Sequence, residues 1–248
     1  MVEPRAARQR KADLEVAALK TEGAISATDP FDPGHRFLRR AFDRAEITAL
    51  TPILAGIPSS AAGKRWAGRE LAALLQALEM QPIQRKLDAL LPGMAVIRAV
   101  AFRKDADANW FVPPHQDRSI PVPSPALLPG FGNLTRKDGG WQAEAPVELL
   151  SAMRNCRIFV DRATVDDGPL EVIPGSHRRG RIEQAEIPAA IGSRSWLPLT
   201  GETGDVVVLS PLLLHRSRRA VEPHGRRVFQ LECIPAGLAP TLGLQAAR

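Results

Sequence analysis

The stretch Asn109–Ile120 reads Asn-Trp-Phe-Val-Pro-Pro-His-Gln-Asp-Arg-Ser-Ile, and its two central residues decide how the rest of the chain is interpreted. His115 and Asp117 lie two positions apart within it. In an extended segment, side chains at positions i and i+2 point to the same face, so an imidazole nitrogen and a carboxylate oxygen come side by side. A second imidazole would complete a two-histidine, one-carboxylate triad, a donor set that leaves coordination positions open and suits Fe(II).

The third ligand is predicted from the position of the remaining histidines. His215 comes directly after the apolar run Val206–Leu214, a hundred residues beyond His115. We therefore predict that His115, Asp117 and His215 together hold a metal ion. The other histidines lie in turns or in the N-terminal region and are not ligand candidates: His35, His177 and His224.

The hydrophobic pattern divides the chain into a helical part and a strand-rich part. Residues 1–30 are interpreted as a mobile or loosely docked segment, and residues 31–248 as a single domain. The helical part of this domain covers residues 35–92, with a first helix predicted over residues 35–50. An amphipathic helix is predicted where leucines recur at i, i+3, i+4 and i+7, at Leu71, Leu74, Leu75 and Leu78.

The β core is predicted over residues 94–236, where short apolar runs are separated by turns rich in glycine and proline. No helices alternate with these runs, which argues for an antiparallel barrel or jelly roll and against a parallel sheet. The N-terminal helical region is expected to pack on this core. Residues 121–146 are interpreted as a long loop over the site.

Composition limits the partners and the compartment. The net charge of +6 and the pI near 10 come from basic residues spread along the chain, so nucleic-acid binding is not expected. No apolar run approaches the ~18 residues of a membrane span. The N-terminus lacks a hydrophobic signal core, and the two cysteines are interpreted as buried thiols, so a cytoplasmic protein is expected.

Four pieces of sequence resemble the phytanoyl-CoA dioxygenase family of Fe(II)/2-oxoglutarate-dependent oxygenases. The first is the stretch around His115, and the second is Asp167–His177, which reads Asp-Gly-Pro-Leu-Glu-Val-Ile-Pro-Gly-Ser-His. The third joins Gly204-Asp205 to the segment Leu212–Ser217, and the fourth is Arg226-Arg227. The resemblance runs from about residue 98 to residue 235.

This resemblance implies a double-stranded β-helix of the jelly-roll, cupin-like type, with Fe(II) bound by His115, Asp117 and His215. It implies 2-oxoglutarate and O₂ as cosubstrates, with the carboxylate of 2-oxoglutarate paired with Arg226. It further implies a dioxygenase that hydroxylates a small-molecule substrate and releases succinate and CO₂. The alternatives are a non-catalytic jelly-roll binding protein and one that uses a different metal.

The residues around Arg226 support that assignment independently. Arginine offers a planar fork that binds a carboxylate through two hydrogen bonds, which lysine cannot do. Ser217 shares strand parity with His215, so its hydroxyl is predicted to face the same cavity. Arg226 shares parity with Gln230, and the opposite face is predicted to carry the apolar side chains Phe229, Leu231 and Cys233.

Two more residues are candidates for the pocket. Arg98 lies inside an apolar run and either contacts the cosubstrate or substrate or forms a structural salt bridge. Trp110 either walls the pocket or belongs to the core. The basic tracts 178–181 and 216–219 would favour an anionic substrate only if both reach the mouth of the cavity; otherwise they are solvated surface.

Overall fold

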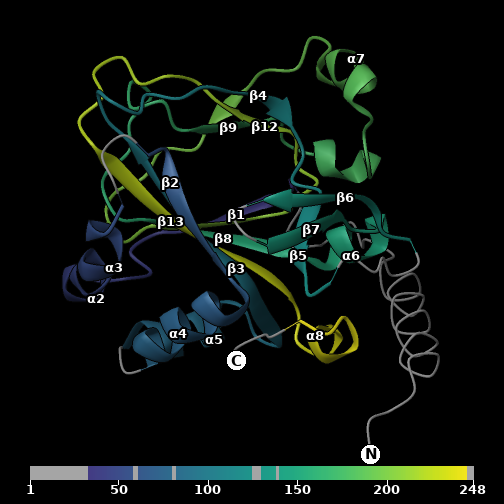
Figure 1. Ribbon diagram of the computed structural model, residues 1–248. Helices are drawn as coiled ribbons and strands as arrows, with labels where there is room; N and C mark the ends of the chain where they lie inside the picture. The colour runs from purple at the N-terminus through teal and green to yellow at the C-terminus, as the bar shows by residue number, and fades with distance from the viewer. Residues whose placement is uncertain (1–32, 58–60, 80–81, 125–129, 138–139, 245–248) are drawn as a thin grey trace, which may run out of the picture.

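The computed structural model describes residues 33–57, 61–79, 82–124, 130–137 and 140–244 (Figure 1). The predictions for residues 1–30 lie outside the described residues. Within the described ranges, none of the helices is both long enough and apolar enough to cross a membrane.

A large antiparallel sheet of six strands forms the centre of the fold (Figure 1). Its strands, in order across the sheet, are β1 (His35–Leu38), β11 (Val206–Leu209), β8 (Arg154–Phe159), β13 (Arg226–Pro235), β3 (Met94–Lys104) and β2 (Gly63–Ala67). Because strands distant in sequence are neighbours in this sheet, the fold is the mainly β, jelly-roll type that the sequence predicts.

Two smaller antiparallel sheets accompany the large one. The first has the order β10 (Leu197–Pro198), β9 (Leu170–Val172), β12 (His215–Ser217) and β4 (Val112–His115). The second, called here the flap sheet, has the order β5 (Ser119–Val122), β7 (Gly140–Glu144) and β6 (Gly132–Lys137). The prediction of a loop over residues 121–146 is therefore wrong for its second half, because β6 and β7 pair as a hairpin.

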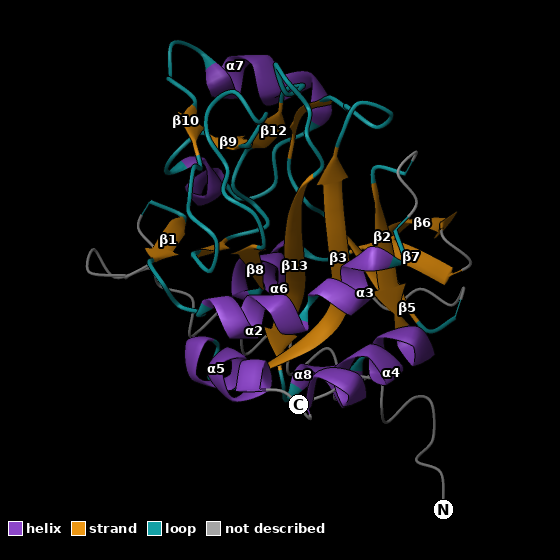
Figure 2. Cartoon of the chain, turned by 90° about the vertical axis from the view of Figure 1, so that its left-hand side faces the viewer, coloured by secondary structure: helices purple, strands orange, loops and turns teal. Residues whose placement is uncertain are grey.

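Helices cover the outer face of the large sheet, away from the four-stranded sheet (Figure 2). In the helical part they are α2 (Arg44–Ala49), α3 (Thr51–Ala55), α4 (Gly68–Glu79) and α5 (Pro82–Leu90). The remaining helical segments are α6 (Val147–Ala152), η1 (Ser176–Arg179), η2 (Gln184–Glu186), α7 (Ile187–Ile191) and α8 (Leu238–Thr241). The predicted leucine face of α4 is buried in one hydrophobic cluster with Phe229, Leu231 and Cys233 of β13.

The prediction of a helix from residue 35 to residue 50 is wrong in its first part. His35–Leu38 is a strand, because pairing with β11 satisfies its backbone groups and because Phe37 stacks on Phe159 at a centroid distance of 6.2 Å. The helix starts later, at the Asp43 cap, where Asp43 and Glu46 form a reciprocal capping box. Strand β2 is a second departure from the helical assignment of residues 35–92.

Candidate metal centre

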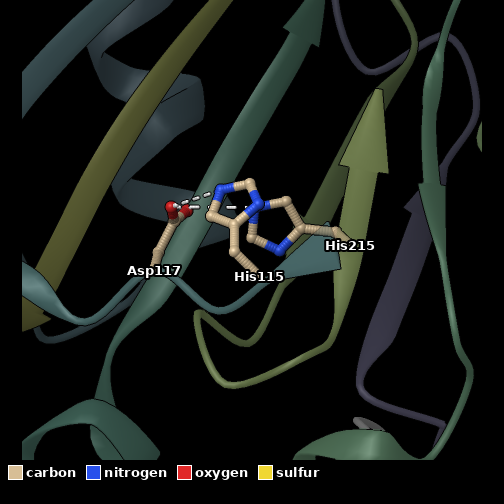
Figure 3. A group of neighbouring side chains, drawn as sticks. All are labelled: His115, Asp117 and His215. Atoms are coloured by element: carbon tan, nitrogen blue, oxygen red, sulfur yellow. Dashed lines mark ion pairs between the residues drawn. The ribbon is translucent and has the colours of Figure 1, made fainter. Parts of the chain in front are cut away.

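Three side chains from two adjacent segments form the candidate metal centre (Figure 3). His115 ends β4 and His215 begins β12, and the two residues are direct partners in the four-stranded sheet. Asp117 follows β4, and its backbone N–H donates to the carbonyl of Pro211 at 2.9 Å. The ligand atoms of the three residues lie within 4.8 Å of one another, which is the spacing that a single metal ion requires. The structure thus brings together the three residues that the sequence selects.

Hydrogen bonds hold both imidazoles in the orientation that a metal needs. Nδ1 of His115 lies 2.9 Å from the carbonyl of Pro113, and Nδ1 of His215 lies 2.8 Å from the carbonyl of Leu213. A carbonyl oxygen can only accept a hydrogen bond, so each Nδ1 carries the ring proton. Each unprotonated Nε2 therefore has a lone pair available to bind a metal ion. The two Nε2 atoms lie 3.7 Å and 3.6 Å from Oδ1 of Asp117.

Asn155 of β8 orients the carboxylate, and sequence reasoning missed it. Its Nδ2 donates to Oδ2 of Asp117 at 3.0 Å, and the side chain is buried. This bond occupies one carboxylate oxygen and leaves Oδ1 directed at the histidines. The only signal in the sequence is a polar residue at an inward position of an apolar strand.

The three groups shift one another's pKa values. Burial and the neighbouring His215 lower the pKa of His115. Burial by itself would raise the pKa of Asp117, but His215, His115 and Arg98 outweigh it and hold that pKa well below its usual range. Burial lowers the pKa of His215, and Asp117 more than offsets this, so the pKa is raised. The site therefore presents an ionised carboxylate to two imidazoles, as a divalent cation requires.

A cavity of about 500 Å³ opens beside the triad between the large sheet, the four-stranded sheet and the flap sheet. Three of the residues predicted for the pocket line it, namely Arg98, Trp110 and Ser217. Gln230, predicted to share the inner face of its strand with Arg226, also lines it. Arg157 and Glu232 line it as well and were not predicted. Arg226 is buried on the same face of β13 as Gln230, but it does not line this cavity.

At the cavity wall and behind it, three buried cations lie on one face of the large sheet. Arg226 donates from Nη2 to the carbonyl of Gly168 at 3.3 Å, and its Nε has no hydrogen-bond partner. Arg157 donates to Oε1 of Gln230 at 3.0 Å and lies over the ring of Phe102. Within the described part of the chain, neither arginine forms an ion pair with a carboxylate, so this region is suited to an anion.

The third cation, Lys104, holds the start of the Asp167–His177 stretch in place through Gly168. Its Nζ donates to Ser217 Oγ at 2.8 Å, to the carbonyl of Gly168 at 2.9 Å and to the carbonyl of Arg218. Ser217 Oγ also donates to the carbonyl of Gly168 at 3.1 Å. Gly168 has a φ of +57°, and a Cβ there would collide with the carbonyl of Arg218, so the position requires glycine.

Arg98 and Trp110 both line the cavity, and Trp110 belongs to none of the hydrophobic clusters among the described residues. A contact of Arg98 with cosubstrate or substrate stays a prediction. Arg98 forms a buried ion pair with Glu232 at 2.6 Å and lines the cavity as well. The indole N–H of Trp110 donates to the carbonyl of Arg103 at 2.8 Å, and Lys104 Nζ lies 4.3 Å from the centre of its ring. Both residues are structural members of the cavity wall.

The two basic tracts do not deliver free positive charge to the cavity. Arg216 and Arg218 both pair with Glu171, at 2.5 and 2.6 Å. Arg181 of the other tract pairs with Glu183 at 2.8 Å and lies outside the cavity lining. The condition under which these tracts would favour an anionic substrate is not met.

Comparison with solved structures relates this architecture to known enzymes. HygX from Streptomyces hygroscopicus, solved with nickel and 2-oxoglutarate bound, has a TM-score of 0.56 at 15% identity, covering 86% of this chain and 87% of that one. The epimerase SnoN, solved with Fe³⁺, α-ketoglutarate and nogalamycin RO, gives 0.59 at 14% identity, covering 89% and 84%. The carbocyclase SnoK from nogalamycin biosynthesis gives 0.55 at 16% identity, covering 86% and 85%.

These likenesses establish a shared fold. No curated protein matches the chain in sequence. The sequence model of one family, however, matches most of the chain, from residue 8 to residue 228. The chain therefore belongs to the phytanoyl-CoA dioxygenase (PhyH) family.

Proposed function

We propose that this protein is an Fe(II)- and 2-oxoglutarate-dependent oxygenase that hydroxylates a small molecule, with release of succinate and CO₂. The observation that carries the proposal is the convergence of His115, Asp117 and His215 within 4.8 Å at the wall of a cavity. Two imidazoles and one carboxylate are a donor set that suits Fe(II) and leaves positions open for other ligands.

The residues behind the cavity fit a dicarboxylate cosubstrate. Arg226 carries a buried Nε without a partner, and Arg157 is a buried guanidinium that lines the cavity. A carboxylate that accepts from such a fork gains charge-assisted hydrogen bonds and removes the cost of a buried unpaired cation. We assign Arg226 and Ser217 to the carboxylate of 2-oxoglutarate and add Arg157 as a further partner.

The protein's own contribution is to hold the ligands and to keep the site dry. When bound, iron and 2-oxoglutarate supply the oxidising chemistry with O₂. The carbonyls of Pro113 and Leu213 and the amide of Asn155 keep the three ligands oriented. Apolar side chains of the cavity wall limit water around the site: Val100, Phe102, Leu170 and Leu209.

Hydroxylation is proposed as the simplest outcome of this chemistry. Neighbours of the same fold include an epimerase and a carbocyclase, and hydroxylation is the simplest of the outcomes that such a site would support. The alternative of a non-catalytic binding protein is disfavoured because the triad and the buried arginines are all present.

The test is substrate-independent turnover of 2-oxoglutarate, measured as succinate release in the presence of Fe(II) and O₂. His115→Ala and His215→Ala should each abolish metal binding and succinate release while the far-UV circular dichroism is retained. His224→Ala is the matched control, because His224 is exposed and lies outside the triad. Full activity in either ligand variant would refute the assignment.

A further inference from the structure

A second cavity of about 580 Å³ adjoins the metal-site cavity. It lies between the start of α4 and β2 on one side and the flap sheet on the other. Arg65, Arg98, Lys137 and Gln142 line both cavities. A molecule that reaches the metal centre therefore has room to extend into this second space.

Side chains of Arg98 and Gln142 form the partition between the two cavities. Arg98 Nη1 donates to Oε1 of Gln142 at 3.2 Å, and Nη2 donates to the carbonyl of Ser119 at 2.9 Å. These bonds join β3 to the flap sheet. Among the described residues, the side chain of Gln142 makes this one hydrogen bond.

The second cavity carries an excess of positive charge. Among the described residues, its lining holds four basic side chains, Arg65, Arg69, Arg98 and Lys137, and one carboxylate, Glu70. Arg98 already has Glu232 as its partner, but among the described residues neither Arg69 nor Lys137 forms an ion pair. This differs from the basic tracts at 178–181 and 216–219, where glutamates pair with Arg181, Arg216 and Arg218.

The flap-sheet wall of the second cavity carries apolar side chains beside Lys137. Pro121, Val122 and Pro123 follow one another along and after β5, and Trp141 on β7 lines the cavity with them. Cations on both walls, beside an aromatic and proline surface, suit an amphipathic molecule, because each part of the molecule meets a matching surface.

We propose that the second cavity binds the anionic end of the substrate, a phosphate or carboxylate group carried on an apolar or aromatic body. Arg69 and Lys137 hold the anion, Trp141 contacts the body, and the other end passes Arg98 and Gln142 toward the metal centre. The inference rests on the proposed function only for the chemistry at that far end.

The test is calorimetric titration of the full chain loaded with Ni(II), which does not support turnover, and saturated with 2-oxoglutarate. The probes are 4-phenylbutyl phosphate and 4-phenylbutan-1-ol, which share a body and differ in the anionic group. The phosphate should bind at least about tenfold more tightly. Arg69→Ala/Lys137→Ala should remove about tenfold of that affinity and leave the alcohol unchanged.

The matched control is Arg36→Ala/Lys64→Ala, which removes the same charge from two exposed residues outside both cavities. It should change phosphate affinity by less than about twofold.

Equal affinity for the two probes, an equal loss in the control, or disappearance of phosphate binding upon saturation with 2-oxoglutarate would each overturn the inference. Failure of 2-oxoglutarate itself to bind would refute the proposed function, and the probe comparison without 2-oxoglutarate would still test the second cavity.

Discussion

Arg226 and Arg227 are neighbours in sequence whose side chains lie on opposite faces of β13. Arg226 is buried beside Gly168, whereas Arg227 forms a two-point ion pair with Asp161 at 2.8 Å on the outside. The strand parity predicted from the apolar residues Phe229 and Leu231 matches this placement. The role of Arg226 toward 2-oxoglutarate remains a prediction.

If Arg226 binds 2-oxoglutarate, replacement by lysine should have different effects on 2-oxoglutarate affinity at Arg226 and at Arg227. Arg226→Lys keeps the charge but loses the fork, so the 2-oxoglutarate affinity should fall about ten- to a hundredfold, which corresponds to ~1.5–3 kcal/mol. Arg227→Lys should leave the affinity nearly unchanged. Both are measured by 2-oxoglutarate titration of the Ni(II)-loaded protein, with Arg157→Lys as the comparison for the newly assigned residue. A large effect at Arg227 with none at Arg226 would contradict the assignment.

Lys104 predicts a pH dependence of stability. Burial, Arg226 and Arg157 lower its pKa to about 7, whereas a lysine in the unfolded chain has a pKa of about 10.4. Between these values the unfolded chain binds more protons, so the free energy of unfolding should rise with pH in this window and stay flat below it.

The comparison is between the wild type and Lys104→Met in urea at pH 7 and pH 9. The wild type should gain about 2 kcal/mol relative to the variant over this interval. Lys64→Met is the control, because Lys64 is exposed. The same pH slope in wild type and Lys104→Met would show that Lys104 does not titrate in this window.

At the scale of elements, α4 couples the helical part to the large sheet. Leu71, Leu75 and Leu78 are buried in the cluster that also contains Phe229 of β13, so one helix face covers the outer side of the central strands. The periodicity of these leucines is enough to predict both the helix and its buried face, because the pattern is set by the 3.6-residue repeat.

Truncation of this face should lower stability without touching the metal centre. Leu78→Ala should reduce the free energy of unfolding by about 2–5 kcal/mol, because it removes buried methyl groups and leaves a cavity. Urea denaturation measures the change, and Gln76→Ala, at an exposed position of the same helix, should stay within about 0.5 kcal/mol. Metal affinity should be the same in both variants. A loss as large at Gln76 as at Leu78 would contradict the packing argument.

At the scale of the whole molecule, the metal centre lies where the layers meet. His115 and His215 belong to the four-stranded sheet, and Asp117 is held by Asn155 of the large sheet. A ligand that binds this arrangement and not the unfolded chain stabilises the whole fold by mass action.

Addition of Ni(II) and 2-oxoglutarate should therefore raise the free energy of unfolding. The gain should be about 2.7 kcal/mol when the free ligand concentration is about a hundred times the dissociation constant for the folded protein. Thermal or urea unfolding with ligands and with a chelator gives the difference. His115→Ala should lose the gain and His224→Ala should keep it. An equal gain in the two variants would place the stabilising metal elsewhere.

The sequence by itself determined the elements and residues whose evidence is local. Leucine spacing predicts α4, strand parity predicts the inner and outer faces of β13, and the His115-x-Asp117 spacing predicts two ligands on one face. Each depends only on the geometry of a single element. The position of His215 after an apolar run predicts the third ligand. The motif pieces add the family, because their order along the chain is itself informative.

The tertiary structure decided everything that depends on contacts between distant segments. His35–Leu38 is a strand because β11 supplies its hydrogen bonds, and the flap hairpin exists within a segment whose sequence is typical of a loop. Asn155 and Arg157 lie at the site because β8 pairs with β13 and β11. The sequence of β8 alone does not specify these partner strands. Hydrogen bonding and burial across the sheets override local propensity there, since an extended strand gains its backbone partners only from other parts of the chain.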